Sequence, residues 1–451
     1  MTGRVTQSVM STSLRDMYAA RIIRLAVMAL LVTAPFFLYP LFERPSVSQS
    51  HYIAAASLSL CLLSALMLLF VRPAGAYAPL IPGAIFLAVL LLSAIFSPEP
   101  LFCFKELLFT LGCAGIGALL VLFPQRSGGM AAVTDLLATV SLVAAVYGIA
   151  QNYGFEILGY QPEMKQGKLS VISVFGHPNY LAAFLGPMLP VMFQSVFSRR
   201  GALVRVFHLM SAAAVFACIL LAGTRGAWLS LAVASSAFVV FVLRRGSPDA
   251  LNIRRIIHVT LTSFAVLVCL VLIVLPILGP RYSIRERFTD LMPLQSRLYS
   301  ARMAAEMLRS RPVLGVGFGR YKVLYWDTVG AFQKRPENRI YDYLLNYGRG
   351  VPPLNVHNEY VEFAAEAGIL GLAAFFFFLV SLFTTGWRRL GGEGNAGAGN
   401  ALLPGLMAGI VFLLADALLN FPLHQPLSAL LFWVLCGLIL SSGKEMNHVC
   451  H

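Results

Sequence analysis

The chain has few charged residues. Asp, Glu, Lys and Arg make up 12% of its 451 residues, about half of the share found in ordinary soluble domains. Hydrophobic residues make up 58%, which is more than a single soluble core of this length would bury. This composition excludes an ordinary soluble enzyme and indicates an integral membrane protein.

Cysteine is absent from the longest polar segment, which runs from about Gly279 to Ala365. The seven cysteines lie almost entirely inside apolar runs, so we expect neither disulfides nor cysteine-based metal sites. The chain also lacks the short apolar core and small-residue cleavage site of a signal peptide. We therefore expect the first membrane span to be retained.

Apolar runs that are long enough to cross the hydrocarbon core recur along the chain, each bounded by Pro, Gly or charge. No alternation of about ten residues suggests a barrel. The predicted fold class is an all-α polytopic membrane protein with about twelve transmembrane helices and one large periplasmic loop domain containing short helices. The predicted spans are residues 22–41, 53–71, 79–96, 101–123, 131–151, 179–197, 203–222, 226–243, 256–278, 366–386, 401–420 and 426–442.

The basic residues are distributed unevenly between the two ends of these spans. Cytoplasmic loops carry an excess of Lys and Arg, and the excess is strongest here when both termini are placed in the cytoplasm. The +14 net charge then reflects membrane topology, and we expect no nucleic-acid partner. The opposite short loops carry only Arg44, Lys165, Lys168 and Arg225.

This topology divides the chain into three parts. Residues 1–278 hold spans one to nine, residues 279–365 form the periplasmic loop domain, and residues 366–451 hold spans ten to twelve. The basic residues of the loop suit either anionic headgroups and diphosphates or an ordinary solvated surface. Residues 296–310 of the loop are predicted to be helical, with Ser296 as the N-cap and Pro312 ending the helix.

His357 stands at the predicted start of the helix that enters the tenth span. Asn355 or Asn358 is available to cap this helix. The positive end of a helix disfavours imidazolium, so we expect a neutral histidine that acts as a general base. The alternative is a histidine that merely caps the helix or bonds a neighbour.

Other polar residues fall near the same predicted face. Arg225 lies in a very short turn between two spans, where it either belongs to a site or reaches the lipid headgroups. Asp416 lies within the eleventh span and should face a cavity or pair with an arginine. His177 and Asn179 open the sixth span and His424 follows the eleventh, so all three are possible cavity residues, although His177 also suits a simple turn.

Several short motifs between about residues 140 and 440 follow one another in a characteristic order. The motifs are 176–182 (GHPNYLA), 224–228 (TRGAW), Arg297 with Ala301, 312–317 (PVLGVG), 357–360 (HNEY) and 366–371 (EAGILG). In this order the chain resembles the O-antigen ligase family, which includes lipopolysaccharide O-antigen ligases, O-antigen polymerases and pilin-type O-oligosaccharyltransferases. It departs from many members in having Tyr299 and Ser300 where they place a tryptophan.

The resemblance implies a glycosyltransferase of the bacterial inner (plasma) membrane that uses no metal, nucleotide or other cofactor. Such an enzyme moves a finished glycan from undecaprenyl diphosphate to a lipid A-core acceptor on the periplasmic face, with inversion. Position by position, Arg225 and Arg297 match the family's essential arginines and His357 matches its essential histidine. We expect the arginines to bind the diphosphate and His357 to be the catalytic base.

Three other functions stay open at this stage. A polymerase or a protein O-oligosaccharyltransferase of the same superfamily would share the donor, the membrane lipids and the same residues. A transporter or flippase is a less expected alternative, because the intramembrane charges are few and gather toward the outer side.

Overall fold

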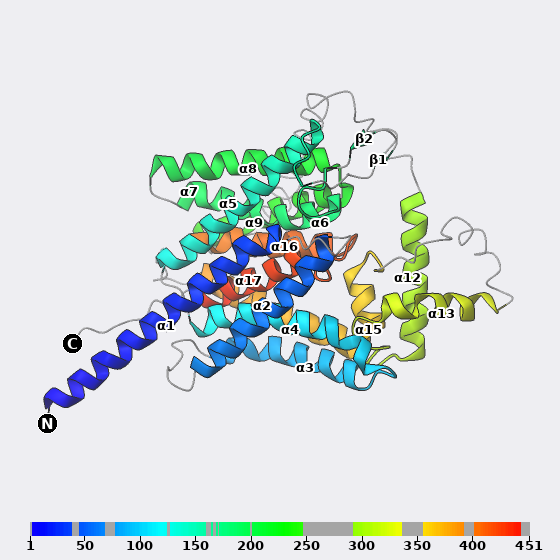
Figure 1. Cartoon of the computed structure of the whole chain (residues 1–451), viewed down its shortest axis with the longest axis horizontal. Helices are drawn as coiled ribbons and strands as arrows, with labels where there is room; N and C mark the ends of the chain where they lie inside the picture. The colour runs from blue at the N-terminus through cyan, green and yellow to red at the C-terminus, as the bar shows by residue number, and fades with distance from the viewer. Residues whose placement is uncertain are drawn as a thin grey trace.

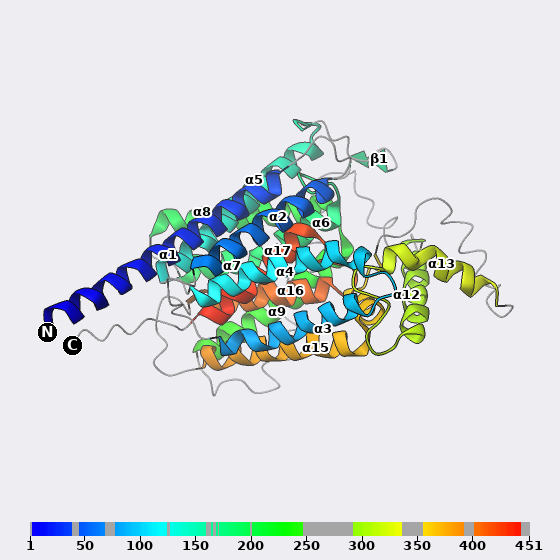
Figure 2. The same ribbon diagram turned by 60° about the horizontal axis from the view of Figure 1, so that its bottom comes forward.

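The computed structural model describes residues 2–37, 45–67, 77–123, 127–158, 164–165, 168–169, 171–198, 201–246, 292–335, 355–391 and 401–442. These residues form a bundle of long helices, with the start of α1 extending from one end and α12 and α13 lying at the other (Figure 1). A turned view shows the same arrangement (Figure 2). The helices and strands are η1 (Ala78–Leu80), α1 (Thr2–Phe36), α2 (Pro45–Met67), α3 (Ile81–Ile95), α4 (Pro100–Leu122), α5 (Ser127–Asn152), β1 (Met164–Lys165), β2 (Lys168–Leu169), α6 (Pro178–Leu185), α7 (Met188–Ser198), α8 (Ala202–Ala222), α9 (Arg225–Gly246), α12 (Met292–Ser310), α13 (Tyr321–Gln333), α15 (Glu359–Leu390), α16 (Leu403–Asp416) and α17 (Pro426–Ser441).

Nine helical segments among the described residues are long and apolar enough to cross a membrane. One of them consists of α6 and α7 together, and two shorter apolar helices, α16 and α17, complete the bundle. The predicted helical, multi-pass class is therefore confirmed. The span predicted at 256–278 lies outside the described residues, so the total of about twelve stays a prediction. The strands β1 and β2 form one antiparallel pair of two residues each.

The centre of the bundle is made by α16 and α17. Every residue of α17 is buried, which fits a helix that is apolar on all sides. At the crossing of α17 and α4, a Cβ added to Gly437 would overlap the backbone of Gly117, so small residues allow the close approach. The 14 residues of α16 rise only about 21 Å, less than the ~30 Å of the hydrocarbon core. On its own, α16 is therefore too short to cross the hydrocarbon core.

The loop domain is described for residues 292–335 and again from residue 355. Its first helix, α12, ends at Ser310 as predicted but begins at Met292, so the prediction of Ser296 as the N-cap is wrong. Pro293 does not prevent this earlier start, because proline is tolerated in the first turn of a helix. The division into three domains stays a prediction. The core shared by α12 and α13 contains Tyr299, Met303, Met307, Tyr321, Tyr325 and Phe332.

The turn after α12 fits into a break in α15. Gly368 has φ 70° and ψ −174°, and the helix resumes after it. The amide of Ile369 donates a hydrogen bond to the carbonyl of Pro312 at 2.9 Å. A Cβ on Gly368 would overlap the carbonyl oxygen of Val313. The break therefore joins the loop domain to the membrane helix.

We expect Gly368→Ala to destabilise the protein by about 2 kcal/mol or more, because alanine disfavours this positive φ and its methyl group would overlap Val313. The melting temperature of the purified protein in detergent should fall. Gly330→Ala in α13 is the matched control, because a Cβ there meets no atom within 4 Å. Equal melting temperatures for the two variants would contradict the role of the break.

Candidate active site

The N-terminal end of α15 is docked on the turn that follows α16. Asn358 caps the helix, since its side-chain oxygen accepts a hydrogen bond from the amide of Val361 at 3.1 Å. Its Nδ2 donates to the carbonyl of Leu418 at 3.1 Å, and the amide of Glu359 donates to Ala417 at 2.8 Å. Of the two predicted caps, the structure uses Asn358.

His357 precedes this cap in a conformation that is uncommon for a residue other than glycine, with φ 61°. Its ring lies edge-on to Phe421, with 4.9 Å between the ring centroids. Burial lowers the pKa of His357 to about 4, with further lowering by the charge of Arg297 and by His177. Its Nδ1 is buried and has no hydrogen-bond partner among the described residues. The imidazole is therefore neutral at neutral pH. The causes are burial, Arg297 and His177, whereas the sequence suggested the positive end of the helix as the cause of the neutral state.

Arg297 of α12 lies close enough to both this histidine and Arg225, the first residue of α9, for the charges to interact. Burial lowers the pKa of Arg297, and the like charge of Arg225 lowers it further, while Asp416 opposes the shift. Arg297 also acts on the pKa of His357. The structure thus brings together the two arginines and the histidine that the sequence singled out, from three separate segments.

Asp416 is buried, with only 1% of its surface exposed, and lies close enough to Arg297 to influence its pKa. Its Oδ1 accepts a hydrogen bond from Asn420 at 2.7 Å, and Asn420 in turn accepts one from Asn179 at 3.0 Å. A Cβ on Gly226 would lie 3.5 Å from the same Oδ1, so the start of α9 passes directly over the carboxylate. Its Oδ2 has no hydrogen-bond partner in the described part of the chain.

His177 is the N-cap of α6, where its Nδ1 accepts a hydrogen bond from the amide of Asn179 at 3.1 Å. Its ring lies 4.9 Å from that of Tyr180. The simple turn role considered for His177 is thus present, and the residue also lies close enough to influence the pKa of His357. His177 and Asn179 both border the site.

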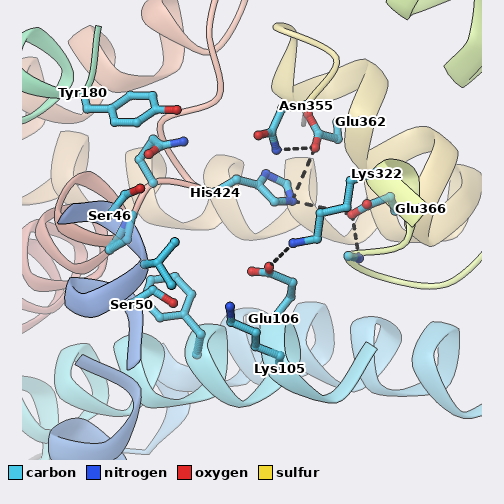
Figure 3. Close-up of a pocket in the computed structure, with 15 residues that line it drawn as sticks. Ser46, Ser50, Lys105, Glu106, Tyr180, Lys322, Asn355, Glu362, Glu366 and His424 are labelled. Carbon is cyan, nitrogen blue, oxygen red and sulfur yellow. Dashed lines mark hydrogen bonds and ion pairs between the residues drawn. The ribbon is translucent and has the colours of Figure 1, made fainter. Parts of the chain in front are cut away.

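His424 belongs to a different cluster (Figure 3). Its Nδ1 lies 2.5 Å from Oε1 of Glu359, and its Nε2 lies 3.5 Å from Glu366 and 3.9 Å from Glu362. Burial alone would lower the pKa of His424, but the three glutamates together raise it well above its usual value. His424 is therefore an imidazolium that holds the α16–α17 turn to α15.

Glu362, Glu366 and His424 offer ligand atoms within 4.8 Å of one another, a donor set that a divalent ion could use. The carboxylates are already occupied, however. Glu366 accepts hydrogen bonds from the amides of Gly319 and Tyr321, both at 2.8 Å. Glu362 likewise accepts one from an amide and one from a side-chain NH₂ group. With His424 protonated, this cluster is an anchor of the loop domain rather than a metal site.

The His424 cluster gives a testable dependence of stability on pH. Because the pKa of His424 is raised on folding, its stabilisation is complete below the usual value of 6.5 and is lost as the pH rises through the raised pKa. We expect His424→Gln to lower the melting temperature most at about pH 6, with the gap to wild type narrowing at alkaline pH. A gap that does not change with pH would contradict the imidazolium assignment.

Sequence reasoning missed most of this cluster. The signal was present, because Glu359, Glu362 and Glu366 lie on one face at helical spacing just before an apolar run. Next to the cluster, Glu106 of α4 binds Lys322 of the loop domain at 2.6 Å, a contact that only the fold reveals.

Helix number, burial and these charged groups define a multi-pass membrane protein with an arginine-lined site at one end of its bundle. Residues 210–376 match the family model described as O-antigen ligase, which confirms the family resemblance predicted from the sequence. The matched segment contains Arg225, Arg297 and His357, and it supports a membrane enzyme of the glycosyl-transfer class. No curated protein matches the chain significantly.

Proposed function

We propose that this protein transfers a glycan from undecaprenyl diphosphate to a lipid A-core acceptor on the periplasmic face of the bacterial inner membrane. The observation that carries the proposal is that Arg297 lies within electrostatic reach of both Arg225 and the uncharged imidazole of His357. Two guanidinium groups suit a diphosphate, and a neutral imidazole suits the removal of a proton from a hydroxyl group.

The positions of other arginines support this orientation. Arg225 begins α9 and Arg244 and Arg245 come near its end, about 30 Å away along the helix. Arg244 lies 5.3 Å from the ring of Trp387. Arg389 approaches the end of α17, donating to the carbonyl of Ile439 at 2.6 Å. The positive-inside rule assigns this basic end to the cytoplasm, and so assigns the candidate site to the opposite face.

The proposed reaction is a single displacement. Arg225 and Arg297 bind the two phosphates and stabilise the negative charge that develops as the bond between the sugar and the diphosphate breaks. His357 accepts the proton of the acceptor hydroxyl, whose oxygen forms the new bond on the opposite face of the sugar, giving inversion. The charge of Asp416 acts on Arg297 and favours its charged form. The arginine pair compensates the charge of the leaving group, so we expect no need for a metal.

Reconstitution tests this proposal. Purified protein in liposomes receives an undecaprenyl-diphosphate-linked glycan and lipid A-core, with and without a chelator. We expect glycosylated lipid A-core, in equal amounts under both conditions. Extension of a second lipid-linked glycan would instead indicate a polymerase, and modification of pilin a protein O-oligosaccharyltransferase. Movement of the donor between leaflets without any transfer would indicate a flippase and overturn the proposal.

A further inference from the structure

A cavity of about 280 Å³ lies beside the His424 cluster (Figure 3). The residues that line it come from α2, α4, α6, α13, α15, the start of α17 and the turns next to them, so it forms only where the loop domain meets the bundle. It does not include Arg225, Arg297 or His357. Its polar lining includes Ser46, Ser50, Lys105, Glu106, Lys322 and Gln425.

The chemistry of this lining suits the hydroxyl groups of a sugar. The Lys322–Glu106 ion pair, 2.6 Å between Nζ and Oε1, places hydrogen-bond donors beside acceptors. A sugar hydroxyl both donates and accepts, so it can bind such a pair, and charged partners strengthen its hydrogen bonds. Phe109 and Tyr180 add aromatic surface for the apolar face of the ring. An acyl chain would offer these charged groups no hydrogen-bonding partner, and the carboxylates disfavour a phosphate.

The cavity and the candidate active site share a wall. Asn355 lines the cavity and stands two residues before His357. Tyr180 also lines it, and its ring lies 5.9 Å from that of Phe421, which packs against His357 at 4.9 Å. A glycan with one unit in the cavity would therefore have its next part beside the proposed base.

We propose that this cavity binds one sugar unit of a glycan substrate and so selects the glycan that is joined. Its volume lies just under the ~300 Å³ at which sites for drug-sized ligands begin, so it holds one unit rather than several. The assignment of this glycan as a substrate rests on the proposed transfer reaction. The binding of a sugar in the cavity does not require that reaction to occur.

The test is direct binding to the purified full chain, measured by saturation-transfer NMR with two free oligosaccharides. One is the core oligosaccharide released from lipopolysaccharide, and the other is the glycan released from the lipid-linked donor. We expect one of them to bind, and its identity tells whether the cavity serves the acceptor or the donor. Ser50→Phe fills the cavity and should weaken binding about tenfold or more. Ser59→Phe, exposed on the same helix, is the matched control and should bind as wild type.

Two further variants separate this proposal from the proposed function. Lys105→Met removes an exposed charge from the lining and should also weaken binding. This variant keeps the test decisive if Ser50→Phe does not fold. His357→Ala should bind the oligosaccharide normally. Suppose that the wild-type protein binds the oligosaccharide, that the cavity variants lose this binding, and that the wild-type protein shows no transfer. The cavity assignment would then stand and the proposed transferase function would be overturned. Absence of binding for both oligosaccharides, or normal binding by Ser50→Phe and Lys105→Met, would overturn the cavity assignment itself.

Discussion

Replacing His357 by Ala should lower the rate of glycan transfer at least ~100-fold, because a positioned general base contributes this much or more. The amount of protein in the membrane should stay near that of wild type. His357→Asn is the sharper variant, since asparagine tolerates the positive φ of this position but cannot act as the base. Substitution of His51, an exposed histidine of α2, serves as the control. Normal transfer by His357→Asn would refute the assignment of the base.

The pH dependence of transfer tests the surroundings of the same residue. A base works when it is deprotonated, and burial beside Arg297 lowers the pKa of His357 to about 4. We therefore expect kcat/KM to show no loss from this group between about pH 7 and pH 5, and to fall only as the pH approaches 4. A histidine with the usual pKa would lose activity below about pH 6.5. An activity that halves near that value would contradict the buried, arginine-flanked environment.

Replacing Arg225 or Arg297 by Lys should have an effect of similar size, a loss of about 100-fold or more in kcat/KM. The charge is kept in each case, but a lysine cannot reproduce the planar pair of donors that an arginine presents to a phosphate. Arg309→Lys on the same helix as Arg297 is the matched control, because Arg309 is 62% exposed and binds Glu306 at 2.8 Å. Its transfer rate should be unchanged. Full activity in both site variants would mean that neither arginine binds the diphosphate through a paired contact.

The positions of the membrane helices were predictable because the hydrophobic signal is local. The predicted span at residues 366–386 falls inside α15, and the other spans predicted on described residues overlap helices, although the span predicted at 401–420 runs four residues past Asp416, where α16 ends. The predicted helix start at His357 was close, since Asn358 caps α15 and the helix begins at Glu359, but the membrane span was predicted to begin only at Glu366. Composition argues against placing acids in a span, whereas the glutamates of α15 pair with His424 only once the chain has folded.

The site was predictable only in part, for the same reason. The order of motifs singled out Arg225, Arg297 and His357, and the structure brings them together, while their roles stay predictions. The sequence offered His424 as a cavity residue of that site, but the glutamates of α15 hold it in the neighbouring cluster. The ion pair of Glu106 with Lys322 joins segments more than 200 residues apart. No local sequence pattern predicts a contact between residues so far apart in the chain.

The break at Gly368 has a mechanical consequence. Because the turn after α12 is hydrogen-bonded into the break, the helix that carries Arg297 is fastened to the helix whose N-terminus carries His357. That one junction sets where α12 lies against the start of α15. A substitution there would therefore shift Arg297 relative to His357 without touching either residue.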